Sequence, residues 1–492
     1  MRKQYDVMLI GTSIGGLVAS SLLARQGLQV LVVNQEQIPW EFSYQGYSIE
    51  RESLLGYGFK RYLFEAIFEE LEIRSQEQGL FERSQPYFQV ILPTLRLDIF
   101  SQRKKLLNEY KREFPKEISA IKEFYKILDS NVGAMETKMS MVPFKNTRWD
   151  YALPKLPKNG TSKQHLNQIF SQLKLSPTFQ KVIQAQLHFL SNIHSPNPTV
   201  AQAAQILCNT HRKDYFFFGK SKDLAQIFYD RIEESGGAIR NDAIVEKLLI
   251  DKGRIKGARL SSFEGVVKAK TYIGNVEIHR LLDLLDPKKT ALSNIRKLKQ
   301  LKPCFAKCSF YLGIKRDVIP IKMGSHLVFI CDEIRPLLED NLIFIHVLPP
   351  TIDSDYSILH VEFLLPYPQS PFKNINLFSQ KGQEIRKKVL ENLSWLMPFL
   401  KENILFTLPH LTSKKRDQNR IIKSMDLFPL FRGIYDFSVR KKPTEEQISN
   451  RTNFLNLFYT GPEVYPFLGF EGETLSSLKT ADMALKQIQK MP

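Results

Sequence analysis

Two short apolar runs near the amino terminus flank a stretch with helical periodicity. Val7 to Ile10 and Val30 to Val33 are continuous apolar runs, which is typical of strands buried on both faces of a parallel sheet. Between them, Leu17 to Arg25 repeats apolar residues at helical spacing, and Gly27 is suited to end that helix. The pattern therefore predicts a strand, a helix and a second strand that together form a parallel βαβ unit.

The same periodicities divide the rest of the chain into helical and strand-rich blocks. The helical blocks are Gln102 to Ser130, Ser162 to Asn209, Ser221 to Gly236, Gln380 to Leu400 and Glu473 to Ile488. The strand-rich blocks are Ala243 to Lys270 and Cys304 to Pro366, followed later by a short strand at Leu457 to Tyr459. Residues 131–165 show no clean period and are predicted to form a loop or lid.

The turn after the first strand carries most of a dinucleotide fingerprint. Gly11 to Gly16 matches G-x-G-x-x-G at its first and last glycines, and Ser13 replaces the middle one. Free backbone N–H groups and the positive end of the helix dipole favour a pyrophosphate at such a turn. At the end of the second strand, Asn34 stands where an Asp or Glu normally binds ribose hydroxyls, and its amide lacks the charge of a carboxylate. The alternative is a βαβ unit whose glycines serve only packing.

Length and composition change this picture little. The 492 residues suffice for about two or three domains, and 43% hydrophobic with 24% charged residues is ordinary for a soluble protein. Apolar runs fall short of the roughly eighteen residues of a membrane helix, and the chain enters its first strand without a signal peptide. We therefore expect a cytoplasmic or peripheral protein.

The charge balance bears on partners. Lys plus Arg number 69 against 51 Asp plus Glu, which gives a net charge of +18. Such an excess can serve nucleic acid or an anionic membrane surface. The basic residues are spread along the chain and no nucleic-acid module is recognisable, so nucleic acid is not expected. Peripheral association with an anionic membrane surface is therefore one expectation, and a generally lysine-rich composition is the alternative.

Metal, hydrolase and kinase chemistry find no support in the motifs. Four cysteines do not make a disulfide framework in a chain of this size, and the nine histidines show no metal-ligand spacing. No nucleophile elbow or phosphate-binding lysine loop is present. His188, His194 and His279 are expected to be structural, so no catalytic residue is singled out and no metal is expected.

Several later segments carry a family resemblance in their order and spacing. They are Gly46 to Ile49, Glu234 to Ile239, Val245, Gly253 to Arg259, Asn275, Leu457 to Gly461, Pro466, Gly469 and Gly472. With the first turn, they make the chain similar to the FAD-dependent phytoene desaturase and retinol saturase-like oxidoreductases. That family lies within the amine-oxidase and glutathione-reductase-type flavoproteins. Phe467 and Leu468 stand where the family has small residues.

The resemblance implies an α/β fold with a discontinuous, Rossmann-like FAD-binding domain and an inserted mixed-sheet and helical substrate domain. FAD-binding parts would cover residues 1–75, 215–295 and 441–492, with a helical substrate or lid region at 76–214 and a substrate-domain sheet with helices at 296–440. The resemblance places the following residues at FAD: Gly11, Ser13, Ile14, Gly15, Gly16, Asn34, Gln35, Val245, Asn275, Gly461, Gly469, Phe470 and Gly472. Gly11 to Gly16 would line the pyrophosphate, Asn34 the ribose and Val245 the adenine.

The closing helix is expected to begin near Glu473 and to direct its positive end toward Phe470 to Gly472, beside the flavin ring. Capping of that helix is the expected role of Glu473.

The implied reaction is hydride transfer between flavin and a C–C bond of an apolar isoprenoid, carotenoid, retinoid or other lipid. Two alternatives stay open. The first is a non-catalytic or flavin-degenerate member, similar to Rab escort and GDP-dissociation-inhibitor proteins, that binds a lipid or a prenylated partner; Ser13 and Asn34 favour it. The second is an amine-oxidase-like flavoenzyme.

Overall fold

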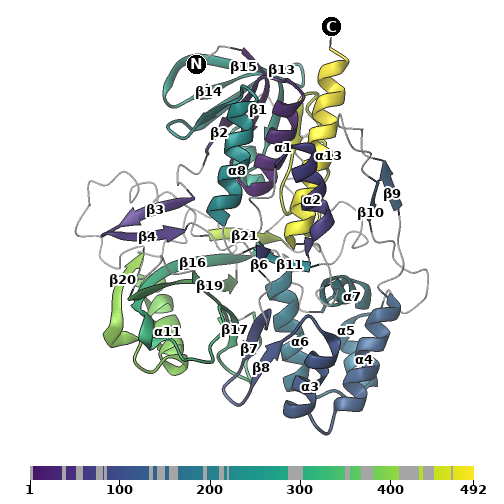
Figure 1. Ribbon diagram of the computed structural model, residues 1–492, viewed down its shortest axis with the longest axis vertical. Helices are drawn as coiled ribbons and strands as arrows, with labels where there is room; N and C mark the ends of the chain where they lie inside the picture. The colour runs from purple at the N-terminus through teal and green to yellow at the C-terminus, as the bar shows by residue number, and fades with distance from the viewer. Residues whose placement is uncertain are drawn as a thin grey trace.

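Two large sheets, each with its own helices, organise the molecule, and both chain ends lie beside the first of them (Figure 1). The computed structural model describes residues 4–35, 40–50, 59–73, 81–82, 86–131, 137–140, 150–153, 164–191, 197–209, 215–218, 221–285, 303–338, 340–348, 355–366, 380–408, 431–435, 448–466 and 469–491. The predicted α/β fold class is confirmed.

The first sheet is built around the predicted amino-terminal strand. Its order is β12-β2-β1-β15-β14-β13, and β22 also pairs with β15. The strands are β1 (Gln4–Ile10), β2 (Val30–Val33), β12 (Ala238–Arg240), β13 (Val245–Asp251), β14 (Arg254–Leu260), β15 (Phe263–Gly274) and β22 (Leu457–Tyr459). β12, β2, β1, β15 and β22 run parallel, so their carboxyl ends meet at one edge. Strands from three distant parts of the sequence therefore share that edge.

Three helices pack together on this sheet: α1 (Ile14–Arg25), α8 (Ser221–Glu234) and α13 (Gly469–Gln489) (Figure 1). α1 lies between the other two and is buried along nearly its whole length. Its small residues allow close approach, since Ser21 Oγ donates to the backbone oxygen of Phe228 on α8 at 3.2 Å. The predicted βαβ unit is confirmed as β1, α1 and β2.

The second sheet has the order β20-β16-β19-β18-β17-β7-β8, with β21 also paired to β16. Its strands are β7 (Phe88–Ile91), β8 (Arg96–Ile99), β16 (Pro303–Lys315), β17 (His326–Ile330), β18 (Leu342–Leu348), β19 (Tyr356–Pro366), β20 (Ile404–Leu408) and β21 (Phe431–Tyr435). α11 (Gln380–Leu396) covers one face, where Val389 and Leu393 pack in a cluster with Phe310 and Phe363. Side chains alternate between the two faces of a strand, so every second residue of these strands points to the face opposite α11.

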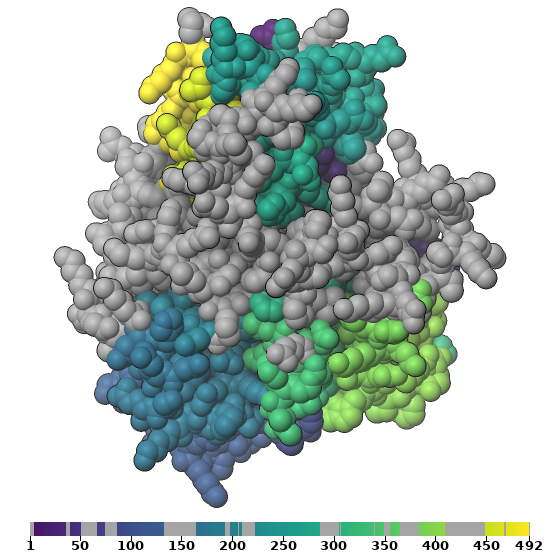
Figure 2. Space-filling view, turned by 180° about the vertical axis from the view of Figure 1, so that it is seen from behind, coloured from purple at the N-terminus to yellow at the C-terminus, as the bar shows by residue number. Residues whose placement is uncertain are grey.

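A helical segment adjoins the second sheet: α3 (Arg103–Glu113), α4 (Ile118–Asn131), α5 (Leu166–Gln172), α6 (Pro177–Leu190) and α7 (Val200–Asn209). The predicted helical block from 102 to 130 is interrupted between α3 and α4. Pro115 explains the break, because proline lacks an N–H group and disfavours helical backbone at the preceding Phe114, whose φ is −124° and ψ 56°. From behind, this blue segment lies beside the green parts of the second sheet (Figure 2).

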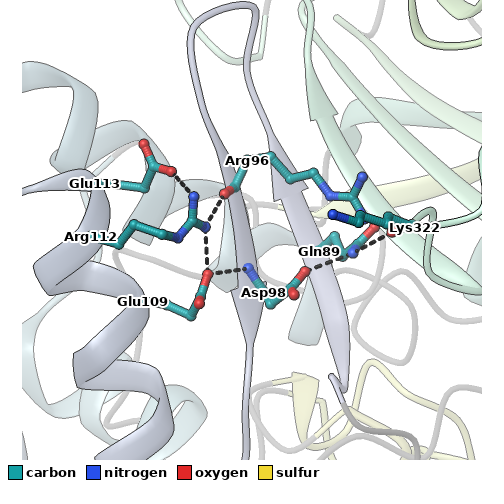
Figure 3. Close-up of polar contacts among 7 residues, drawn as sticks. All are labelled: Gln89, Arg96, Asp98, Glu109, Arg112, Glu113 and Lys322. Atoms are coloured by element: carbon teal, nitrogen blue, oxygen red, sulfur yellow. Dashed lines mark hydrogen bonds and ion pairs between the residues drawn. The ribbon is translucent and has the colours of Figure 1, made fainter.

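The β7–β8 pair joins α3 to the second sheet (Figure 3). On the helix side, Arg112 Nη2 donates to Glu109 Oε2 at 2.6 Å and to the backbone oxygen of Arg96 at 2.7 Å. On the sheet side, Gln89 Nε2 donates to Asp98 Oδ1 at 2.7 Å and to the backbone oxygen of Lys322 at 3.1 Å. The helical segment is thereby fixed to the edge of the sheet.

Smaller elements complete the described chain: β3 (Glu41–Tyr44) with β4 (Tyr47–Glu50), β5 (Phe59–Lys60) and β6 (Phe81–Glu82) with β11 (Tyr215–Phe218), β9 (Thr137–Ser140) with β10 (Asp150–Leu153), α2 (Arg61–Glu70) and α9 (Ile278–Asp283). The β9–β10 pair falls within the predicted loop at 131–165, most of which lies outside the described residues. Among the described residues, no helix has the length and apolar character to cross a membrane.

Candidate cofactor site

The turn between β1 and α1 lies against the carboxyl end of β15. Gly11 has a φ of +106°, and a Cβ there would lie 2.1 Å from the backbone oxygen of Asn275. A Cβ on Gly16 would lie 2.1 Å from Asn275 Oδ1. Both glycines are therefore required by the close approach of Asn275, which is a packing requirement as well as a feature of the fingerprint.

Asn275 holds the turn and connects it to β22. Its Oδ1 accepts from Ser13 N and from Ser13 Oγ, both at 2.9 Å. Its Nδ2 donates to the backbone oxygen of Thr460 at 3.2 Å, and Thr460 N donates to Gly274 O at 2.9 Å. Residues separated by hundreds of positions are thereby brought to the amino-terminal end of α1.

The closing helix begins at Gly469, so the predicted start near Glu473 is wrong. Gly469 has a φ of +54°, and Phe470 to Gly472 form the first turn of α13 because packing buries Glu471 and Gly472. The free N–H groups at the amino terminus of α13 are therefore those of Phe470 to Gly472 themselves, so the end of the helix does not point toward these residues. A Cβ on Gly469 would lie 3.1 Å from the backbone oxygen of Leu190, so this glycine faces α6.

Glu473 reaches across to the other helix. Its Oε1 accepts from Gly15 N at 3.3 Å and forms a shorter hydrogen bond with Ser13 Oγ. The carboxylate therefore lies at the positive end of α1, where a negative charge is stabilised. The predicted capping role is wrong for its own helix, because Glu473 accepts from the first turn of α1.

The adenosine end of the fingerprint is also hydrogen-bonded within the chain. Asn34 Oδ1 accepts from Thr12 Oγ1 at 3.1 Å, and its Nδ2 donates to Asn241 Oδ1 at 3.0 Å. Gln35 makes a two-point contact with Val245: Gln35 Nε2 donates to the backbone oxygen at 2.8 Å, and Val245 N donates to Gln35 Oε1 at 2.8 Å. The backbone groups predicted to meet adenine are thus bonded to Gln35.

A hollow of about 310 Å³ opens beside Asn34 at the carboxyl end of β2. Its walls include Trp40, Tyr229 and Asn241, together with the ion-paired Glu41 and Lys222. Aromatic and amide groups around such a space suit a nucleoside.

The late glycines of the predicted set lie in two places: Gly469 faces α6, as described above, and Gly461 lies beside the turn. Gly461 follows β22 and its N–H donates to Ser476 Oγ at 3.3 Å, beside the turn. A Cβ on Gly461 would lie 2.8 Å from Glu463 Oε2, which accepts from the Tyr459 hydroxyl at 2.6 Å. Phe467, Leu468 and His194 lie outside the described residues.

A row of buried histidines crosses the second sheet, and sequence analysis missed it. Tyr311, His360, His346 and His326 are directly opposed on β16, β19, β18 and β17. His326 Nδ1 and His346 Nδ1 are 3.2 Å apart, and the Tyr311 and His360 rings stack at 4.8 Å. The row faces α6, since the ring of Phe189 stacks on His346. We call His326, His346 and His360 the histidine row.

One ion pair adjoins the histidine row. Lys307 Nζ lies 2.6 Å from Glu362 Oε2, and His346 Nε2 lies 3.4 Å from the same oxygen. Burial lowers the pKa of all three histidines, that of His360 to about 4. Burial alone would raise the pKa of Glu362, but Lys307 and His346 hold it well below the usual range. The row is therefore neutral imidazole beside a charged pair.

We expect the histidine row to make the protein acid-sensitive. A base whose folded pKa is depressed contributes stability above its unfolded pKa of 6.5, and that stability is lost as pH falls toward the folded value of about 4. His360→Phe keeps the stacked ring and removes the titrating nitrogens. Between these pH values, urea unfolding of wild type should lose about 2 kcal/mol more than unfolding of this variant. Equal losses would show that His360 is not buried and neutral.

Comparisons with known proteins bear on the family. No protein-family model matches the chain. The prolycopene isomerase of Daucus carota is 24% identical over 420 residues, which cover 79% of this chain and 65% of that protein. An all-trans-retinol 13,14-reductase of Danio rerio is 22% identical, covering 99% of this chain and 86% of its own. A 4,4'-diapophytoene desaturase of Methylomonas is 21% identical over 64% of this chain and 62% of its own.

The chain is similar to phytoene desaturase and retinol saturase-like oxidoreductases, as predicted.

Solved structures show that the chain shares the fold of known oxidoreductases. An oxidoreductase from Methanosarcina mazei has a TM-score of 0.63 at 14% identity, covering 98% of this chain and 99% of its own. Cyclohexylamine oxidase from Brevibacterium oxydans has a TM-score of 0.58 at 12% identity, covering 99% of both chains. The amine-oxidase-type fold is therefore confirmed.

FAD is the cofactor that the similar proteins and the shared fold indicate, as predicted. Part of the site fits it: the Gly15 N–H and the Ser13 hydroxyl meet at Glu473 Oε1, at the positive end of α1, and a nucleoside-sized hollow lies beside Asn34. Two side chains conflict, because Glu473 lies where the pyrophosphate would bind and Gln35 bonds the Val245 backbone that adenine would meet. The site fits FAD once both side chains have moved.

The predicted set therefore gathers mostly in one region. Gly11, Ser13, Gly15, Gly16 and Asn275 meet at the turn, where Ile14 begins α1. Asn34, Gln35 and Val245 lie together beyond the carboxyl end of β2, where the adenosine is predicted. The set lacked Glu473 because only a contact between residues 458 positions apart reveals its role.

Proposed function

We propose that this protein is a FAD-dependent oxidoreductase that transfers a hydride between flavin and a C–C bond of an apolar isoprenoid, carotenoid, retinoid or other lipid. The observation that carries the proposal is the convergence of the β1–α1 turn, Asn275 and Thr460 at the positive end of α1. The known relatives act, by name, on prolycopene, retinol and diapophytoene. The match covers 65% of the length of the Daucus carota isomerase, so the activity of that protein supports the proposal without establishing it.

The residues of this chain would bind and orient the cofactor. The Gly15 N–H and the Ser13 hydroxyl would hold the pyrophosphate, and the hollow beside Asn34 would take the adenosine. FAD, when bound, supplies the hydride acceptor or donor. The predicted domain boundaries and the remaining cofactor contacts are part of this proposal.

The second sheet would supply the substrate side. The face of the sheet opposite α11 carries Phe344, which lies 5.6 Å from the Phe189 ring of α6, and Phe88 lies 4.8 Å from the same ring. These packed rings would form an apolar wall on the substrate side and exclude water from it. Peripheral association with an anionic membrane stays a prediction from the net charge of +18.

Proton balance assigns a role to the histidine row. Desaturation removes two hydrogens from a C–C bond, one as hydride to the flavin and one as a proton, and saturation returns both. Among the described groups, the row offers buried neutral imidazole, a side chain that exchanges protons, and burial lowers its pKa so that an accepted proton is readily passed on. His360 Nδ1 is buried without a hydrogen-bond partner among the described residues.

The experiment is anaerobic incubation of FAD-loaded protein with polyenes in detergent micelles. We expect the flavin absorption band to change together with the polyene spectrum, and mass spectrometry to find a product that differs by two hydrogens. Protein without FAD is the control. Flavin reduction by amines, with polyenes unchanged, would favour an amine oxidase and contradict the proposal.

A second candidate function is flavin-free binding of a lipid or a prenylated partner. The position of Glu473 favours it, because a carboxylate already satisfies the phosphate-binding turn. Protein that binds such a lipid and never binds FAD would establish this candidate in place of the first.

A further inference from the structure

The chain's own side chains satisfy the parts of the turn that a dinucleotide would use. The Glu473 carboxylate accepts from Gly15 N and Ser13 Oγ. Gln35 presents one donor and one acceptor to the backbone of Val245, which is the pairing that an adenine edge would offer. An anion and an amide therefore occupy positions that correspond to the pyrophosphate and the base.

We infer that Glu473 is an internal substitute for the pyrophosphate, which stabilises the flavin-free protein and must swing away before FAD binds. This inference rests on the proposed function, because it concerns how the same site takes its cofactor. Its chemical basis is that the turn favours one anion and not two.

The space at the turn is too small for both groups. A Cβ built on Gly15 would lie 2.7 Å from Glu473 Cγ and 2.6 Å from Ser477 Oγ, so α13 packs directly against the first turn of α1. Ser477 Oγ donates to the backbone oxygen of Glu473 at 2.8 Å, which keeps this part of α13 regular. For FAD to bind, the side chain of Glu473 therefore has to rotate away while the helix that carries it stays packed against α1.

Charge removal at Glu473 should therefore have opposite effects on the two forms of the protein. In flavin-free protein, the loss of the carboxylate leaves Gly15 N and Ser13 Oγ without this acceptor and lowers stability. In the presence of FAD, the same loss removes repulsion and raises affinity, which raises stability through binding. A residue with a purely structural role would lower stability in both forms.

The test compares wild type with Glu473→Gln, which keeps the shape, and Glu473→Ala, which removes the group. Asp482→Asn is the matched control, since it removes one negative charge from α13 at a residue paired with Lys486, away from the turn. FAD affinity is measured by quenching of flavin fluorescence in full-length protein, and melting temperature is measured with and without FAD.

We expect both Glu473 variants to bind FAD at least about tenfold more tightly than wild type, because a like charge beside the phosphates is lost. They should melt lower than wild type without FAD and higher with saturating FAD, and Asp482→Asn should change neither affinity nor the order of melting. FAD bound equally or more weakly by the variants would overturn the inference while leaving the proposed function intact. No binding by wild type or any variant would overturn both.

Discussion

Gly11→Ala is expected to lower the free energy of unfolding by about 3 kcal/mol or more, because two penalties act together. Gly11 has a φ of +106°, where a side chain is strained, and its Cβ would lie 2.1 Å from the backbone oxygen of Asn275. Relief of that clash requires β15 to move from β1 at the edge where the candidate site is built. Urea unfolding followed by circular dichroism measures the loss.

Gly27→Ala is the matched control for this prediction. Gly27 also has a positive φ, +80°, but nothing lies within 4 Å of its Cβ position. Its substitution should cost only about 1 kcal/mol, the strain of the left-handed backbone alone. If the two substitutions lower the free energy of unfolding equally, Asn275 does not approach the turn as closely as described.

Lys307→Met is expected to cost about 2 kcal/mol at pH 8, because it leaves Glu362 charged and mostly buried beside the histidine row. The estimate is below that for a fully buried pair, since the Lys307 side chain is 29% exposed. The cost should shrink as pH falls. Without Lys307 the pKa of Glu362 rises, and protonation then removes the unpaired charge.

The double variant Lys307→Met with Glu362→Gln is the control. It removes both charges, so it should be more stable than Lys307→Met alone at pH 8, as measured by urea unfolding. A double variant that is less stable than the single one would contradict the assignment of Glu362 as an unpaired charge in the single variant.

The periodicity of apolar residues predicted those helices and strands whose formation depends mainly on nearby residues. β1, α1 and β2 follow from two apolar runs and one helical stripe, and α8 lies where the periodicity of Ser221 to Gly236 placed it. Gly11 and Gly16 were predicted through the phosphate fingerprint. The structure adds a second reason for them, which is the approach of Asn275.

Contacts between residues far apart in the sequence determine the start of α13, the role of Glu473 and the histidine row, and none of these could be predicted from local patterns. Glycines at 469 and 472 favoured a loop before Glu473, yet burial of this segment against α1 extends the helix to Gly469. The role of Glu473 depends on a neighbour from the other end of the chain. His360 and Glu362 alternate with the period of a strand, a signal that places both on one face. Only the register of β17, β18 and β19 shows that the histidines form a row.

A crystal structure determined with saturating FAD, for wild type and for Glu473→Gln, tests the central claim most directly. The account predicts that the pyrophosphate lies at the Gly15 N–H and the Ser13 hydroxyl and that the Glu473 side chain of wild type has rotated away from them. FAD bound elsewhere, or absent from this turn in both proteins, would contradict it.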